Sequence, residues 1–258
     1  MKKLLFISLL LLLPAPVLAG NLLVLVHGYA AHAGTWEYSG INRLLQANGW
    51  QHVASPQAAD NLFYAAHLPA QAPLTFQAGI LLSQLQMLRA QYPDRQITLA
   101  GHSAGGVVAR LAVLNGNPAG VSRLVSIASP NLGTPRAAQG LDIVEDKPFF
   151  CPGPGWYALK SFFGGSRYRY LEDSKGALYQ MLPPGFGSLI ARINQQPHPD
   201  IEYHSIVRQY GDLMVPAYSQ DMNNVPVLSG KSRVWMSNAP HFLNMHDGQL
   251  LLSILNGQ

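Results

Sequence analysis

The sequence predicts an α/β fold, in which helices flank both faces of a mostly parallel central sheet. Three observations carry this prediction. Short apolar runs are typical of strands buried on both faces, helical segments alternate with these runs, and one long Gly- and Pro-rich segment interrupts the alternation, as an inserted cap would. The 258 residues are enough for one large domain with a sizeable core.

The expected elements follow one another along the chain. The first strand, residues 22–26, is wholly apolar and ends at His27-Gly28-Tyr29. The other expected strands are residues 50–54, 96–100, 121–128, 201–207 and 233–236. A helix is expected over residues 74–92, where leucines recur at helical spacing and Pro93 follows. Residues 105–114 and 248–255 are expected to form two further helices.

Residues 136–200 break this alternation. They show little periodicity and are rich in Gly and Pro, for example at residues 151–155. A structureless loop of this length is uncommon in a compact domain, so we expect an inserted cap of short helices. The segment also contains many aromatic side chains, namely Phe149, Phe150, Trp156, Tyr157, Phe162, Phe163, Tyr168, Tyr170, Tyr179 and Phe186.

The first residues have the layout of a secretory signal peptide. Lys2 and Lys3 form a positive head, and residues 4–13 are an apolar run. This run is too short to span a bilayer, which takes roughly 20 residues. Small side chains at Val17 and Ala19 fit a cleavage site. We therefore expect residues 1–19 to be removed after Ala19, residues 20–258 to form the folded domain, and the protein to be secreted or periplasmic.

Charge and cysteine content exclude several classes of protein. Charged residues make up 12% of the chain, against about 25% in typical domains, and the formal net charge is +4. The tightest basic cluster, residues 167–169, is too small for a nucleic-acid footprint, so no nucleic-acid partner is expected. The single cysteine, Cys151, excludes an intrachain disulfide and a CxxC zinc site. No HExxH motif occurs, and we expect neither a metal nor a cofactor.

A candidate nucleophile lies where an expected buried strand meets the next helix. Residues 101–105 read Gly-His-Ser-Ala-Gly, the G-x-S-x-G nucleophile elbow. This turn is so sharp that the serine Oγ is pushed out of the fold. Gly101 and Gly105 lack the Cβ that would collide with the neighbouring backbone, and the helix N-terminus places a partial positive charge near the reacting oxygen. Ser103 is therefore the expected nucleophile.

Together with four other segments, this elbow resembles the α/β-hydrolases of the lipase/esterase group, in particular secreted bacterial triacylglycerol lipases and carboxylesterases. These segments are His27-Gly28-Tyr29, residues 129–135 (SPNLGTP), residues 211–216 (GDLMVP) and His241-Phe242-Leu243. Pro240 stands where this group often has Gly. The resemblance spans nearly all of the chain after residue 19. It implies an α/β-hydrolase fold and the activity of a serine hydrolase.

Acyl transfer by a serine also needs a base that accepts its proton and a carboxylate that orients this base. The chain order in this fold is Ser, acid, His. His241 directly follows a strand, in the loop before the last helix, and is the preferred base, with His246 as the alternative. Asp212 lies in a turn after strand 201–207 and is the preferred acid, with Asp221 as the alternative.

Three other histidines are expected to have structural roles. His204 lies within a buried strand, His27 should support the loop after the first strand through hydrogen bonds, and His102 should point away from the nucleophile. The negative oxygen of the tetrahedral intermediate needs two preset donors, and loss of one typically costs about 3 kcal/mol. The backbone N–H groups of Tyr29 and Ala104 are the expected oxyanion hole.

The function expected from these features is hydrolysis of lipid-like acyl esters. An apolar, aromatic cap favours an apolar acyl chain over a small charged substrate. Residues 136–200 should cover Ser103, line an acyl-binding groove with some of their aromatics and contact a lipid interface transiently. The same triad would also serve a thioesterase, an acyltransferase or an amidase. A non-catalytic binding module is the alternative from a different class.

Overall fold

The computed structural model describes residues 20–55, 59–114, 116–145, 165–185 and 187–257. The expected signal peptide, residues 1–19, and Cys151 lie outside these ranges. Within them, no helix combines the length and the apolar character needed to cross a membrane.

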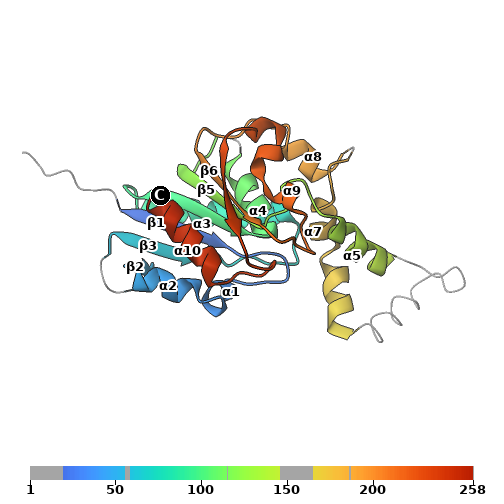
Figure 1. Ribbon diagram of the computed structural model, residues 1–258, viewed down its shortest axis with the longest axis horizontal. Coiled ribbons are helices and arrows are strands. Elements are labelled where there is room, and N and C mark those ends of the chain that lie inside the picture. The colour runs from blue at the N-terminus through green and yellow to red at the C-terminus, as the bar shows by residue number, and fades with distance from the viewer. Residues whose placement is uncertain (1–19, 56–58, 115, 146–164, 186, 258) are drawn as a thin grey trace, which may run out of the picture.

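A seven-stranded sheet forms the centre of the molecule (Figure 1), and every pair of neighbouring strands in it is parallel. The strand order is β2-β3-β1-β4-β5-β6-β7. The strands are β1 (Asn21–Val26), β2 (Trp50–His52), β3 (Asn61–Ala65), β4 (Gln96–His102), β5 (Val121–Ile127), β6 (Glu202–Arg208) and β7 (Ser232–Ser237). All strands expected from the sequence are present, and β3 is an additional one. The α/β fold with a parallel sheet is thus confirmed.

Helices cover both faces of this sheet. On one face, α3 (Leu74–Gln91) and α4 (Ala104–Val113) contribute to the larger hydrophobic core. On the other face, α1 (Thr35–Tyr38), α2 (Ile41–Ala47) and α10 (Met245–Leu255) contribute to a second core. Between β6 and β7 the chain forms α9 (Ala217–Gln220) and two short 3₁₀ turns, η1 (Met222–Asn224) and η2 (Pro226–Leu228). The helix expected over 248–255 begins earlier, at Met245, because Asn244 caps it.

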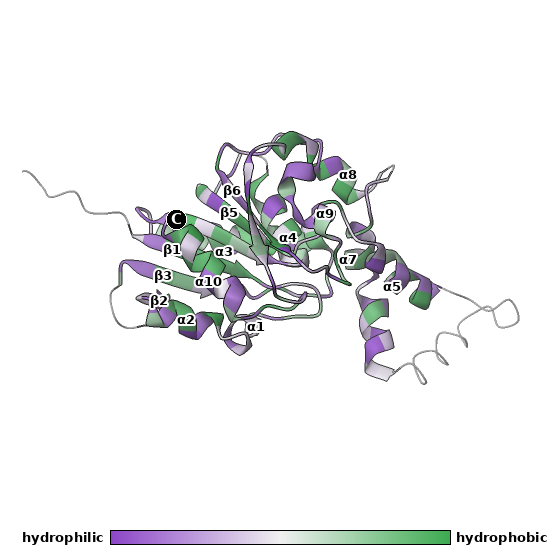
Figure 2. Ribbon diagram, viewed as in Figure 1, coloured by the Kyte–Doolittle hydropathy of each residue, from purple (hydrophilic) through white to green (hydrophobic). Residues whose placement is uncertain are grey.

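Strand β1 shows why apolar runs predict this architecture. Leu22 and Val24 belong to the core under α3 and α4, whereas Leu23 and Leu25 belong to the core under α1, α2 and α10. All four side chains are fully buried. Successive side chains of a strand point to opposite faces, so a strand covered on both faces needs apolar residues at every position. Figure 2 shows these hydrophobic stretches within the sheet, flanked by helices with mixed hydropathy.

The chain between β5 and β6 forms several short helices. They are α5 (Pro135–Glu145), a helical segment over residues 165–173, α7 (Lys175–Gln180) and α8 (Leu189–Ile193). In Figure 1, α5 extends beyond the edge of the sheet at the right of the view. Short helices were expected in residues 136–200, and the described part of this segment contains them. Residues 146–164, with most of the aromatics, lie outside the described ranges.

Candidate active site

Ser103 sits at the sharp turn between β4 and α4. Its backbone has φ 52° and ψ −130°, a conformation that residues with a side chain rarely adopt. Two glycines make the turn sterically feasible. A Cβ on Gly101 would lie 2.6 Å from the Cα of Gly106, and a Cβ on Gly105 would lie 2.6 Å from the carbonyl oxygen of Val26. The predicted elbow is therefore present, with the serine at its tip.

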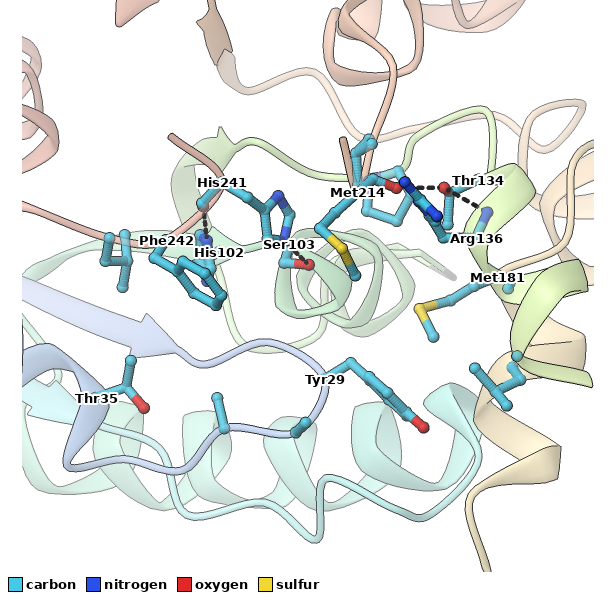
Figure 3. A pocket seen from close by; sticks show the side chains of 18 of the residues that line it. Tyr29, Thr35, His102, Ser103, Thr134, Arg136, Met181, Met214, His241 and Phe242 are labelled. Carbon is cyan, nitrogen blue, oxygen red and sulfur yellow. Dashed lines mark hydrogen bonds between the residues drawn. The ribbon is translucent and has the colours of Figure 1, made fainter. Parts of the chain in front are cut away.

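Ser103 is the first member of a chain of hydrogen bonds. Its Oγ lies 3.0 Å from Nε2 of His241, and Nδ1 of His241 lies 2.7 Å from Oδ2 of Asp212. An ionised carboxylate only accepts hydrogen bonds, so Nδ1 of His241 donates to Asp212 and Nε2 is left to accept from the Ser103 hydroxyl. The structure thus brings the three expected residues together from the ends of β4, β6 and β7 (Figure 3, which labels Ser103 and His241).

The carboxylate of Asp212 is held by several donors. Its Oδ1 accepts hydrogen bonds from the backbone N–H groups of Met214, at 2.7 Å, and Val215, at 3.1 Å. Its Oδ2 accepts another from Nε2 of Gln220, at 3.1 Å. Burial alone would raise the pKa of Asp212, but the hydrogen bond and charge of His241 and the two backbone donors lower it below its usual range. The side chain is therefore an ionised, fixed partner for His241.

The loop that carries His241 is fastened from behind. Nε2 of His102 donates to the backbone carbonyl of His241 at 2.8 Å, and Nη2 of Arg208 donates to the same oxygen at 3.3 Å. Arg208 in turn forms a fully buried ion pair with Asp247, including an Nη2–Oδ2 contact of 3.1 Å. These contacts hold the backbone of His241 and so help to position its side chain beside Ser103.

The expectation for His102 was wrong. Its side chain does not point away from the site: it lies against the His241 loop and lines the same pocket as Ser103. The two imidazole rings have centroids 5.2 Å apart. Burial, followed by the nearby charge of His241, lowers the pKa of His102 to about 3. His102 is therefore neutral and carries its proton on Nε2, because the carbonyl of His241 needs a donor there. The expectation for His102 rested on the geometry of the turn alone, which does not include this tertiary contact.

The alternative base, His246, does not bond to Ser103, and the alternative acid, Asp221, does not bond to His241. The backbone N–H of His246 is capped by Asn244 at the start of α10, and its side chain takes no part in the pocket lining. Asp221 caps η1 by accepting from the backbone N–H of Asn223, at 2.8 Å. His204 is packed and satisfied, as expected, because its Nδ1 accepts from the indole of Trp235 at 3.1 Å.

The loop after β1 passes directly against the nucleophile. A Cβ on Gly28 would lie only 2.9 Å from the Cβ of Ser103, so no other residue fits there without displacement. His27 is buried beneath this loop, with its Nδ1 3.1 Å from the carbonyl oxygen of Gly28. Within the described residues, the backbone N–H groups of Tyr29 and Ala104 donate no hydrogen bond. Both expected oxyanion donors are therefore free to bind a ligand.

A cavity of about 610 Å³ opens over these groups. Its wall contains Ser103 and His241 and residues that follow the carboxyl ends of β1, β4, β5, β6 and β7, where open α/β sheets place their ligands. Figure 3 shows the Tyr29, Met181 and Met214 side chains around this space. The segment between β5 and β6 contributes an apolar part of the wall, made of Ala137, Gly140, Leu171, Leu178 and Met181.

The cavity wall differs from the expected aromatic groove. Tyr168, Tyr170 and Tyr179 are the described aromatics of residues 136–200, and none of them lines the cavity. Tyr168 is buried, Tyr179 is half exposed, and Tyr170 packs edge-on against Tyr29. From this segment, aliphatic and Met side chains line the cavity instead, and the aromatics of the lining, Tyr29, Tyr38 and Phe242, come from outside it. The remaining aromatics of the segment lie outside the described residues.

Several residues that shape this site carry no sequence motif. Gln220, Arg208 and Asp247 act through contacts between segments that are far apart along the chain. Only Asp247 leaves a signal, because Asn244 and Asp247 form a capping box at the start of α10. Among the described residues, no group of three or more His, Cys, Asp or Glu side chains is placed to hold a metal ion.

Two histidines, the buried His102 and the half-buried His198, predict a loss of stability in acid. Nε2 of His198 accepts from Nη2 of Arg110 at 3.2 Å. Burial and then the Arg110 charge lower the pKa of His198 to about 4, and that of His102 is about 3. In the unfolded chain, both histidines become protonated near pH 6.5. The stabilisation is therefore complete above pH 6.5 and is lost as the pH falls toward 4, by about 1.4 kcal/mol per pH unit for the buried His102 and by less for the half-buried His198, whose charge is partly screened by water.

Unfolding temperatures measured from pH 7.5 to 4.5 test this expectation. The His198→Gln variant keeps an acceptor for Arg110 but does not titrate, so its unfolding temperature should fall less steeply with acid than that of the wild type. His67→Gln, at an exposed position, is the matched control and should follow the wild type. Parallel curves for wild type and His198→Gln would contradict the assignment.

Comparison with known proteins shows to which family the chain belongs. Residues 23–251 match the Alpha/beta hydrolase family. No match was found among curated proteins. Similar solved structures include the mature lipase BlEst2 of Bacillus licheniformis, with a TM-score of 0.61 and 16% identity over 95% of this chain and 94% of that one. The esterase EaEST of Exiguobacterium antarcticum has a TM-score of 0.58 and 17% identity over 92% of each chain.

Phospholipase PlaB of Legionella pneumophila is also similar, with a TM-score of 0.56 and 16% identity over 80% of this chain and 46% of that one. At such identities these structures show a common fold. The family match covers most of the sequence, the parallel sheet and the serine elbow. The chain therefore belongs to the Alpha/beta hydrolase family.

Proposed function

We propose that this hydrolase is a serine esterase that cleaves lipid-like acyl esters, with Ser103 as nucleophile, His241 as base and Asp212 as the acid that orients the base. The observation that carries the proposal is the hydrogen-bonded chain from Ser103 to Asp212 at the floor of a largely apolar cavity. Solved bacterial lipases and esterases with the same fold are in keeping with it.

The proposed reaction follows from the direction of these hydrogen bonds. Oγ of Ser103 attacks the ester carbonyl carbon while its proton passes to Nε2 of His241. The carbonyl oxygen becomes negative and is held by the backbone N–H groups of Tyr29 and Ala104. His241 then gives its proton to the leaving alcohol oxygen, and the C–O bond breaks to leave an acyl-Ser103 ester. Water repeats the sequence, releasing the acid and restoring Ser103.

Asp212 has two tasks in this reaction. Its hydrogen bond to Nδ1 fixes the tautomer in which Nε2 of His241 can accept a proton. Its charge stabilises the imidazolium that forms when Ser103 attacks. The carboxylate performs both only while it is ionised, and its lowered pKa keeps it so.

The apolar wall supports an acyl chain as the occupant of the cavity. Leu171, Leu178 and Met181 come from the segment between β5 and β6, line the cavity and pack in the larger hydrophobic core. Each CH₂ group transferred from water to such a wall gains about 0.8 kcal/mol. Esters with longer chains should therefore be preferred to acetate until the cavity is filled.

Exposed apolar side chains at the cavity rim support a contact with aggregated lipid. Tyr38 and Phe242 line the cavity and are 81% and 74% exposed, and Leu213 beside the rim is 84% exposed. Contiguous exposed apolar side chains commonly mark binding surfaces. These three residues lie outside residues 136–200, so the proposed lipid contact involves the rim of the site as well as the cap.

Hydrolysis of p-nitrophenyl acetate and octanoate, below their micelle concentrations, tests the proposed function. We expect kcat/KM for octanoate to exceed that for acetate by tenfold or more. Met181→Trp fills the apolar end of the cavity and should reduce this ratio severalfold. Tyr179→Trp changes an exposed position outside the lining and is the matched control. Repeating the octanoate assay above the micelle concentration measures the benefit of a lipid interface.

Equal kcat/KM values for acetate and octanoate would reject the acyl site and leave a short-chain esterase. A rate on octanoyl thioesters far above that on octanoate esters would move the assignment to a thioesterase. Activity on neither substrate, in protein that is folded, would reject the proposed function.

A further inference from the structure

We propose that Tyr170, in the helical segment 165–173, is a positioning residue that holds the loop over residues 28–31 in the shape that binds the oxyanion. The proposal deepens the proposed function and rests on it. It starts from one contact: the backbone N–H of Ala30 donates to Oη of Tyr170 at 3.0 Å. These residues are 140 positions apart, so the contact joins the cap segment to the loop that faces Ser103.

The loop lies where small shifts matter. The backbone at Gly28 passes against Ser103, and the next N–H, that of Tyr29, is a proposed donor to the oxyanion. An oxyanion donor must lie about 2.7–3.1 Å from the position that the negative oxygen will occupy. A displacement of this loop by a fraction of an ångström is therefore enough to weaken the hydrogen bond on which catalysis depends.

The backbone of this loop is unfavourable at Ala30. Ala30 has φ 55°, in the left-handed region that disfavours residues with a Cβ. The N–H of Ala30 donates to Oη of Tyr170 and to no other described residue. Without an external acceptor, the backbone of Ala30 has no hydrogen bond that offsets its unfavourable conformation. Oη of Tyr170 is that acceptor.

A second connection ties the same loop to the same helical turn. Oγ of Ser174 donates to the carbonyl of Tyr170 at 2.7 Å and lies 2.5 Å from Oη of Tyr29, so Tyr29 donates to Ser174. The rings of Tyr29 and Tyr170 pack edge-to-face, with centroids 5.3 Å apart. Ser174 is fully buried. The backbone of Ala30 and the side chain of Tyr29 are thus held together by residues 170–174.

The hydroxyl of Tyr170 is suited to this role. Burial and the neighbouring Tyr29 raise the pKa of Tyr170 to about 12, so it remains neutral in any ordinary assay. Tyr170 does not line the cavity, so its hydroxyl acts through the loop and not on the substrate. Replacement by Phe removes one oxygen and keeps the ring that packs on Tyr29. This substitution therefore isolates the hydrogen bond to Ala30.

The test compares Tyr170→Phe with the wild type on p-nitrophenyl octanoate and on two inhibitors. One inhibitor is an octyl trifluoromethyl ketone. Oγ of Ser103 adds to its carbonyl carbon, the serine proton passes to His241, and the former carbonyl oxygen becomes a negative oxygen in the oxyanion site. 1-Octanol, whose only oxygen is uncharged, occupies the acyl site without placing a negative oxygen against these donors. We expect kcat to fall about tenfold, less than the ~10²-fold that loss of a whole donor costs, with KM within twofold.

The inhibition constant of the ketone should rise by the same factor as kcat falls, and that of 1-octanol should stay unchanged. Ser174→Ala releases the side chain of Tyr29 and should produce the same pattern more weakly, which keeps the test open if Tyr170→Phe is poorly folded. Tyr179→Phe removes another hydroxyl of the segment, one bonded to Glu145 and outside the cavity, and is the matched control.

Unchanged kcat and ketone affinity in Tyr170→Phe and Ser174→Ala would overturn the proposal, because the loop would then keep its shape without the cap. A parallel loss of 1-octanol and ketone affinity would also overturn it, because Tyr170 would then act on substrate binding. A wild type that hydrolyses no ester and forms no ketone adduct would instead reject the esterase function. The two failures are therefore distinguishable.

Discussion

The Ser103→Ala variant is expected to lose ester hydrolysis almost completely, with kcat/KM reduced by roughly 10³- to 10⁶-fold. The substitution removes the Oγ that attacks the carbonyl carbon and that donates to His241. The remaining rate comes from binding and from the oxyanion donors, which still act on a bound ester. The elbow backbone is unaffected, because the two glycines and not the serine hydroxyl make the turn feasible.

Purified protein of matched unfolding temperature is needed for this comparison. Ser83→Ala is the control, because Ser83 is an exposed serine of α3 whose Oγ bonds only within its own helix, to Gly79. It should keep the wild-type rate. Residual activity of Ser103→Ala within about tenfold of the wild type would show that another group is the nucleophile.

The His241→Ala variant should lose kcat by roughly 10³-fold or more, whereas His246→Ala should stay within about twofold of the wild type. His241 alone is placed between Ser103 and Asp212, at 3.0 and 2.7 Å. The anchoring of its loop survives the change, because His102 and Arg208 bind the backbone carbonyl and not the imidazole. The reverse ranking would move the base to His246.

The pH dependence of the rate provides a further check on the same base. Only the neutral imidazole of His241 accepts a proton from Ser103, so kcat/KM should fall on acidification. Asp212 remains ionised over this range because its pKa is lowered. Each rate has to be measured before the protein unfolds in acid, because protonation of the buried His102 and the half-buried His198 destabilises the fold below pH 6.5.

The sequence predicts the fold where burial is uniform. The apolar strands β1, β4 and β5 contact core on both faces, and their composition reports this directly. Strand β3 was not predicted, although Leu62 and Phe63 are buried, because it is short and begins with the polar Asn61, so its apolar run is brief. Helices α1 and α2 were missed because each has too few turns to establish a helical period.

Some features of the candidate site could likewise be predicted from the sequence, and others could not. Ser103, Asp212 and His241 could be predicted because each follows a strand end, and strand ends meet at one edge of a parallel sheet. The orientation of His102 could not, since it depends on a carbonyl 139 residues away. The buried pair of Arg208 and Asp247 depends equally on tertiary packing. Local sequence thus indicates the three residues that meet at this edge of the sheet, while the contacts that hold them arise from the assembled fold.

Covalent labelling tests the central claim, that Ser103 is a nucleophile activated by His241 and Asp212. The folded protein is treated with an alkyl fluorophosphonate, which loses fluoride as a serine oxygen bonds to phosphorus, and the adduct is located by peptide mass spectrometry. The account predicts one adduct per chain, on Ser103, absent from Ser103→Ala and formed at least 10²-fold more slowly in His241→Ala. No adduct in the wild type, or an adduct on another residue, would contradict it.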